Sequence, residues 1–131
     1  MIKAAIKRLR EAHKLELLGI AVHAMANFGE EITGIPGVVV NVIPQRGSHW
    51  ARLKVAKKGS GFVNKKHNFT VSISDKPQVM VGQSNVKNIC DTQTLQKILK
   101  WVEQNESALL RFWTDNEYLT TEFFSDLKKV K

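Results

Sequence analysis

Four segments with strand patterning follow one another in the middle of the chain, and this succession restricts the fold more than any other feature. They occupy residues 38–43, 49–56, 69–74 and 78–81. The first is rich in β-branched residues, and the third alternates apolar and polar side chains from Phe69 to Ser74. Because strands that are consecutive in sequence usually pair with one another, we predict a four-stranded antiparallel sheet.

The second of these segments divides its side chains between two faces. One face takes Ala51, Leu53 and Val55, and the other takes Trp50, Arg52 and Lys54. Successive side chains of a strand point to opposite faces of the sheet. We therefore expect the apolar set to face the core and the basic set to face solvent.

Helical spacing precedes the sheet. Apolar residues recur every three or four positions from Ile2 to Phe28, although Gly19 interrupts them. We predict one or two helices within Met1–Phe28, ended by Gly29. Glycine and proline dominate residues 29–37, which indicates a loop.

Helical spacing also follows the sheet. Asp91 or Thr92 is expected to cap a helix, and Asn105 to mark a kink or the cap of the next helix. Thr120 is predicted to cap a final short helix, with Lys128 and Lys129 in its last turn. The fold class is thus predicted to be α+β: an N-terminal helical segment, a four-stranded antiparallel sheet, and C-terminal helices packed on one sheet face.

The length of 131 residues suits a single domain spanning 1–131, which buries about two-thirds of the surface that the unfolded chain exposes. The single cysteine, Cys90, excludes an intramolecular disulfide and a cysteine zinc cluster, which favours a reducing compartment. No apolar run reaches the roughly 18 residues that span a bilayer, and no signal-peptide core follows the basic start. We expect a cytoplasmic protein that does not contact a membrane.

The net charge of +8 lies in one half of the chain. Residues 1–66 hold 12 lysines and arginines and 4 acidic residues, whereas residues 67–131 hold 8 of each. Such an asymmetry favours a polyanionic or acidic partner, and solubility alone is the alternative explanation.

Two clusters carry this charge and are the candidate nucleic-acid-binding residues. The first helical segment contributes Lys3, Lys7 and Arg10. The second and third strand segments and the loop between them contribute Arg52, Lys54, Lys57, Lys58, Lys65 and Lys66. Trp50 and Phe62 could stack on bases. No helix-turn-helix, RNP, KH or zinc-finger signature accompanies the clusters, so a solvated face remains the alternative.

The loop after the second segment contains Lys57, Lys58, Gly59, Ser60 and Gly61, but it does not match the P-loop pattern. Its backbone N–H groups and lysines could bind phosphate. A plain hairpin loop is the favoured interpretation.

An enzymatic alternative is a metal-independent ribonuclease. Such a site needs a base, an acid and cations beside the phosphate, and His49, Arg52, Lys54 and His67 offer these residue types. The four histidines show no metal-ligand spacing, and we predict neither a metal site nor a cofactor. Cys90 precedes a helix that could lower its pKa, although no partner base is evident for it.

Aromatic side chains crowd the last third of the chain. They are Trp101, Phe112, Trp113, Tyr118, Phe123 and Phe124. Most should be core, but their density predicts that one or two lie on an exposed patch. Such a patch would mark a homodimer or partner surface.

Four stretches resemble a known family. The first three read HWARLKV at 49–55, NFTVSIS at 68–74 and KPQVMVG at 76–82, and the fourth is the helical stretch that runs from WVE at 101–103 through LLRFW at 109–113. With these, a little over half of the chain resembles the DUF4160 family of uncharacterised small bacterial proteins. Its commoner members carry a histidine-x-histidine pair on the first stretch, where this chain has Ala51. The resemblance implies a bacterial α+β protein, often encoded near mobile or toxin–antitoxin-like loci, and no known activity.

These observations lead to three hypotheses. The first is a non-enzymatic accessory protein of bacterial mobile-element type, which engages nucleic acid or an acidic protein through a basic hairpin and the first helix. The second is a small toxin-like ribonuclease. The third is a homodimeric interaction module. The sequence does not identify the partner, the oligomeric state or the biological process.

Overall fold

The computed structural model describes residues 26–42, 50–62, 65–115 and 117–130. Five strands come first along the described chain: β1 (Ala26–Phe28), β2 (Val38–Val42), β3 (Arg52–Lys57), β4 (Asn68–Ser72) and β5 (Val79–Val81). The longer helices follow as α4 (Thr92–Gln104), α5 (Glu106–Thr114) and α6 (Thr120–Asp126). Short helical turns fill the connections: α2 (Glu30–Thr33), η1 (Lys65–His67), η2 (Gln83–Asn85) and α3 (Val86–Ile89).

The strands form one antiparallel sheet in the order β1-β2-β3-β4-β5. Each strand therefore pairs with its neighbour in sequence, as the short connections predicted. In the centre of the sheet Val40 is opposite Val55, and Val55 is opposite Phe69. The α+β fold class and the antiparallel sheet are confirmed.

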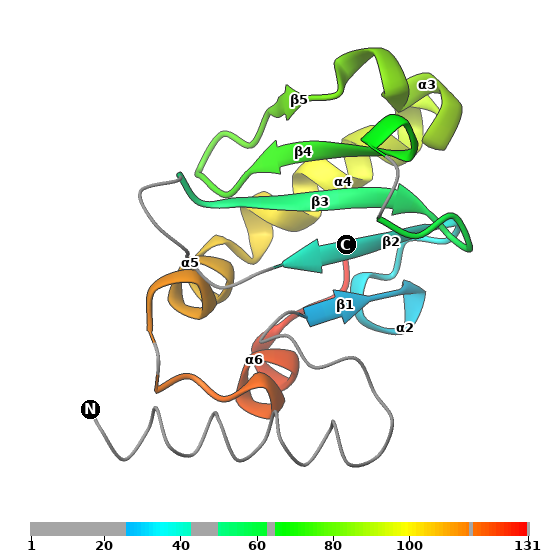
Figure 1. The fold of residues 1–131 in the computed structure, drawn as a ribbon. Coiled ribbons are helices and arrows are strands. Elements are labelled where there is room, and N and C mark those ends of the chain that lie inside the picture. The colour runs from blue at the N-terminus through cyan, green and yellow to red at the C-terminus, as the bar shows by residue number, and fades with distance from the viewer. Residues whose placement is uncertain (1–25, 43–49, 63–64, 116, 131) are drawn as a thin grey trace.

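The helices cover one face of the sheet. In Figure 1, α4 passes behind β3 and β4, while α5 and α6 lie below it. The core between the two layers takes the side chains of alternate strand residues, such as Leu53 and Val55, together with apolar residues of α4, α5 and α6. Rings of Phe28 and Phe123 meet edge to face at 5.5 Å between centroids, and Phe123 stacks on Phe112 at 4.2 Å.

The start of the described chain corrects one prediction. Phe28 was expected on the apolar stripe of a helix ended by Gly29, but it belongs to strand β1 and is opposite Val40. The sheet therefore has five strands rather than four. Spacing alone could not separate these alternatives, because Phe28 is placed by contacts with rings of α4 and α6 that are distant in sequence. Gly29 precedes a helix instead of ending one, and α2 lies within the predicted loop.

The C-terminal helices follow local signals closely. Asp91 caps α4, and its carboxylate accepts a hydrogen bond from the N–H of Thr94 at 2.7 Å. Asn105 separates α4 from α5, as predicted. The final helix ends earlier than expected, because Leu127 is extended. Lys128 and Lys129 consequently lie beyond α6 and not in its last turn.

Candidate nucleic-acid interface

The face of the sheet opposite the helices is polar. The register places Asn27, Asn41, Lys54 and Thr70 in one row across β1 to β4. Arg52 and Ser72 form the next pair along β3 and β4. These residues alternate with the core residues of the same strands, so the predicted division of Leu53 and Val55 from Arg52 and Lys54 is confirmed. We call this surface the open face.

The short polar side chains of the open face are largely covered, and the long ones reach solvent. Asn41 is only 4% exposed, and its amide donates a hydrogen bond to Oδ1 of Asn27 at 2.6 Å. Thr70 is also buried. Lys54 lies between them in the same row, opposite Asn41 on β2 and Thr70 on β4, and is half-buried. A partner at this face would meet the half-buried cations Arg52 and Lys54, the exposed Asn27 and, on β5, Val81, which is opposite Thr70 and 54% exposed.

Trp50 adds an aromatic group to this surface. Its side chain is 42% exposed, whereas Trp101 is fully buried and Trp113 is 8% exposed. The guanidinium carbon of Arg52 lies 5.3 Å from the centroid of the Trp50 ring, a cation–π distance. The contact holds a flat ring and a cation side by side at one end of β3.

Lysines occupy the turn at the other end of β3. Lys57 ends the strand and Lys58 follows it, and both are exposed. The N–H of Lys58 donates to the carbonyl of Gly37, and the N–H of Ser60 donates to the carbonyl of Lys57, each at 3.0 Å. These two N–H groups are used within the protein. They are therefore not available to a phosphate, which favours the hairpin interpretation over a phosphate loop.

The return segment η1 brings Lys65, Lys66 and His67 back beside this turn. The Asn85 side chain helps to hold it there, because its amide donates to the carbonyl of Lys65 at 3.0 Å and to that of Asn68 at 3.1 Å. Gly82 packs against the same point, and a Cβ on it would lie 2.9 Å from the Asn68 carbonyl oxygen. Asn85 and Gly82 thus position η1. The sequence analysis missed both residues, because neither is close to η1 along the chain.

Charge is segregated between the layers. The 43 positions from Ile32 to Ser74 contain seven lysines and arginines and no acidic residue. Strands β2, β3 and β4 all fall inside this range, whereas the acidic side chains of the described chain lie on α2, at Asp75 and in the residues from Asp91 onward. The structure shows no ion pair for Arg52, Lys54, Lys57 or Lys58 with the residues that it describes. We refer to β3, its turn and η1 together as the basic hairpin.

The structure brings six of the nine predicted nucleic-acid-binding residues onto one element. They are Arg52, Lys54, Lys57, Lys58, Lys65 and Lys66, all on the basic hairpin. Lys3, Lys7 and Arg10 lie outside the described residues, so their relation to the hairpin stays a prediction. Phe62 is half-buried in the loop, and its carbonyl accepts a hydrogen bond from the Asn68 amide.

The ribonuclease candidates are not grouped in the described part of the chain. His67 directly precedes β4, at the Lys57 end of the sheet. Arg52 lies at the other end of β3, five residues before Lys57, and is opposite Ser72. A strand rises about 3.3 Å per residue, so Arg52 and His67 are separated by most of the length of β3. His49 lies outside the described residues.

Cys90 is not activated by its position before α4. Burial raises the pKa of the Cys90 thiol, and the charge of the adjacent Asp91 carboxylate raises it further. The helix N-terminus does not lower this pKa, because Asp91 occupies it, and the favoured interpretation of a small structural cysteine is the one that the structure supports. Cys90 packs against the core as a small apolar side chain.

Two absences concern only the part of the chain that the structure describes. It holds no group of three or more histidine, cysteine, aspartate or glutamate side chains close enough to bind a metal ion. Among its helices, none has the length and apolar character needed to cross a membrane.

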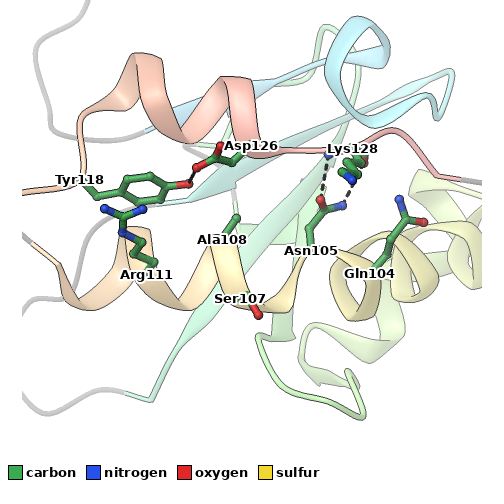
Figure 2. Close-up of a pocket in the computed structure, with 8 residues that line it drawn as sticks. All are labelled: Gln104, Asn105, Ser107, Ala108, Arg111, Tyr118, Asp126 and Lys128. Atoms are coloured by element: carbon green, nitrogen blue, oxygen red, sulfur yellow. Dashed lines mark hydrogen bonds between the residues drawn. The ribbon is translucent and has the colours of Figure 1, made fainter.

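A polar pocket of about 360 Å³ lies between α4, α5 and the C-terminal segment (Figure 2). The hydroxyl of Tyr118 donates to Asp126, and the Arg111 guanidinium lies 4.0 Å from the centre of the Tyr118 ring. Burial, followed by the hydrogen bond to Asp126, raises the pKa of Tyr118. Asn105 donates to the carbonyls of Trp101 and Lys128 and accepts from the N–H of Lys128. These groups satisfy one another, so the pocket acts as an anchor for the C-terminal segment.

A second hollow of about 650 Å³ lies between β5 and the corner of α3 and α4. Val79, Val86 and Leu95 give it an apolar side, and Met80 and Val81 are exposed nearby on β5. The amide of Gln83 donates to the carbonyls of Val79 and Met80. This side chain blunts the strand edge, which disfavours the addition of a further strand there.

The predicted aromatic patch at the C-terminus is wrong. Trp101, Phe112, Tyr118 and Phe123 are buried in the core, Trp113 is almost buried, and Phe124 packs on Phe28. The rings come from α4, α5, α6 and, for Tyr118, the connection between α5 and α6, and not from one helical face. The exposed aromatic residue lies instead on the sheet, at Trp50.

Comparison with known proteins gives no relative from which a role could be taken. No family model, no curated protein and no solved structure matches the chain.

Proposed function

We propose that this chain is a non-enzymatic binding protein that engages nucleic acid through the basic hairpin. One observation carries the proposal: Arg52 and Lys54 stand on one face, and further lysines surround one end, of a sheet whose three central strands contain no acidic residue. A fold does not require this, because a solvated face normally mixes both signs of charge. A phosphate backbone is the abundant partner that such a surface would attract.

The positions of the cations support the same proposal. Arg52 and Lys54 stand on the open face, and Lys57, Lys58 and η1 extend the charge around the end of β3. Asn85 and Gly82 fix η1 against β4, so the two halves of the hairpin are held together before a partner arrives. Preorganised cations lose less conformational freedom on binding than mobile ones. Lys3, Lys7 and Arg10 would add contacts if the first helical segment lies alongside.

With the resemblance noted in the sequence, the proposal becomes an accessory protein of bacterial mobile-element type that acts by binding. Strand cleavage is not part of it, since His67 and Arg52 lie toward opposite ends of β3. An acidic protein would use the same charges, and nucleic acid is favoured because the exposed ring of Trp50 also offers a face on which a base can stack.

The test is a salt titration with matched charge removals. Affinity for labelled RNA and DNA, single- and double-stranded, is measured by fluorescence anisotropy between about 50 and 200 mM salt. The double variant K57Q/K58Q removes two charges from the basic hairpin, and K97Q/K100Q removes two exposed charges from α4 as the control.

We expect K57Q/K58Q to reduce the slope of log affinity against log salt by about 1.4 to 1.8, because each phosphate contact contributes about 0.7 to 0.9. The control should leave the slope unchanged. Labelled RNA should remain intact throughout. Absence of binding at low salt, or equal losses in the two variants, would contradict the proposal, and RNA cleavage would replace it with the ribonuclease alternative.

A further inference from the structure

The part of the open face at the start of β3 has a feature that charge alone does not explain. Trp50 exposes 42% of its surface although the other two tryptophans of the chain are buried or nearly so. An exposed indole is unfavourable in water, since burying an aromatic ring removes a large apolar area from solvent. A partner that covers the ring would remove this cost.

We propose that Trp50, Arg52 and Lys54 form a platform for single-stranded nucleic acid, on which a base stacks against the Trp50 indole and the two cations bind the flanking phosphates. The inference rests on the proposed function and specifies its substrate. It predicts that single strands bind in preference to duplexes and that they bind at the Trp50 end of the basic hairpin.

The spacing of the three residues suits an extended strand. Arg52 and Lys54 are alternate residues of β3, so their side chains stand on the same face, roughly 6.6 Å apart. Trp50 precedes the strand and the bend at Ala51, and its place beside Arg52 comes from the cation–π contact. Arg52 lies against the Trp50 ring at 5.3 Å, which places a cation beside the position of a stacked base. A stacked base would then contact the indole of Trp50, and the neighbouring phosphate would contact the guanidinium of Arg52.

A duplex does not fit this arrangement. Its bases are already stacked on one another inside the helix, and reading their edges requires an element that enters a groove. The major groove admits an α-helix or a two-stranded ribbon, whereas β3 is paired on both sides in the middle of a five-stranded sheet. A single strand can turn its bases outward onto an aromatic side chain, which makes it the matching partner.

Recognition at this platform should depend little on base identity. The amides and hydroxyls that could read base edges, such as Asn41 and Thr70, are buried in the open face, and Asn41 is bonded to Asn27. Stacking and phosphate contacts tolerate any base. We therefore expect similar affinities for different sequences, with modest preference for bases that stack strongly.

The experiment compares W50L and W50F with the unchanged protein. Leucine keeps an apolar side chain without a ring face, and phenylalanine keeps a smaller ring. Each protein is titrated with RNA and DNA single strands of about 12 nucleotides and with duplexes of the same sequence. Because Trp50 is exposed, both variants should fold, which circular dichroism and the thermal midpoint verify.

For single strands we expect W50L to weaken binding by about 5- to 150-fold, the equivalent of one lost base stack, and W50F to retain most of the affinity. Duplex binding should change little in either variant. Tryptophan fluorescence gives a second signal: a single strand should quench it in the unchanged protein and in W113F, but not in W50F. Tighter binding of RNA than of DNA would assign additional contacts to the 2′-hydroxyl groups, and equal binding would assign none; both support the platform.

The two proposals fail separately. If single strands and duplexes bind equally and W50L changes neither, the platform is overturned, while the basic hairpin still binds nucleic acid. If the unchanged protein binds neither kind at low salt, both proposals are overturned.

Discussion

Alternate residues of β3 point into two different environments. Leu53 and Val55 face the helices and are buried among rings from α4, α5 and α6. Arg52 and Lys54 face the opposite way, beside other strands that contain no acidic residue. On the helical side the polar groups satisfy one another, as Asn105 and Tyr118 show. On the open face the cations have no such partner among the described residues.

Stability and charge are therefore assigned to different faces of one sheet. The helical side should determine whether the chain folds, and the open side should determine what it binds. Substitutions on the two sides should therefore have separable effects. The following predictions test this separation, from the largest expected loss of stability to the smallest.

Truncation of the central ring on the helical side should cost most. Phe123 is fully buried and contacts Phe28, Phe112 and Tyr118. We expect F123A to lower the free energy of unfolding by about 3–5 kcal/mol, measured by urea denaturation. F124A, which truncates the half-buried neighbour, is the control and should cost clearly less. Equal costs would show that the core is not organised around Phe123.

Gly82 should be the next most sensitive position, because both its backbone conformation and its close packing disfavour a side chain. Its φ of 82° is unfavourable for other residues, and a Cβ would lie 2.9 Å from the backbone of β4. We expect G82A to cost about 3 kcal/mol and to loosen η1. Gly61 has a φ of 70° with open space around it, so G61A should show the conformational cost alone, about 1 kcal/mol. If the two variants lose the same stability, close packing at Gly82 is not important.

Loss of the Asn105 side chain should cost somewhat less stability. Its amide makes hydrogen bonds with backbone groups at the α4–α5 junction. It is 5% exposed and makes hydrogen bonds of 2.8–2.9 Å to Trp101 and Lys128. We expect N105A to lower the thermal midpoint by the equivalent of about 2 kcal/mol. The control is Q104A, which removes one exposed hydrogen bond to the carbonyl of Lys129 and should cost a few tenths of a kcal/mol. Similar losses in the two variants would contradict the anchoring role of Asn105.

Some of these structural features could be predicted from the sequence, and others could not. The cap at Asp91 and the break at Asn105 were predictable, because the interactions that define them span three or four residues. The two faces of β3 were predictable from alternation in the same way. Strand β1 and the Asn85 contact with η1 were not, because they depend on groups 14 to 20 positions away in sequence. The basic hairpin was therefore found as a list of residues, whereas its open face and its fixed end needed the structure.

The buried hydroxyl of Tyr118 should make the free energy of unfolding depend on pH. Its hydrogen bond to Asp126 should make Y118F less stable at neutral pH by about 1–2 kcal/mol. Because folding raises the pKa of Tyr118, the folded state disfavours the ionised phenol. The stability that this hydroxyl contributes is complete below the unfolded pKa of about 10 and is lost as pH rises above it. The free energies of unfolding of the two proteins should thus converge above pH 10, as measured by urea denaturation. A constant difference across this range would show that the hydroxyl is not coupled to folding.

The smallest effect on stability is expected where the effect on binding is largest. K57Q/K58Q lowers the formal net charge of +8 by two, and it removes like charges that repel one another at the end of the sheet. Surface substitutions of this kind usually change stability by less than about 0.5 kcal/mol, and relief of repulsion makes a small gain the expected sign. Thermal unfolding should therefore show an unchanged or slightly higher midpoint in the same preparation whose affinity for nucleic acid has fallen. If the variant instead unfolds at lower temperature, the lysines stabilise the hairpin itself, and a loss of binding could no longer be attributed to lost phosphate contacts. An unchanged fold with lost affinity would show that the cations of the open side are retained for a partner and not for the fold.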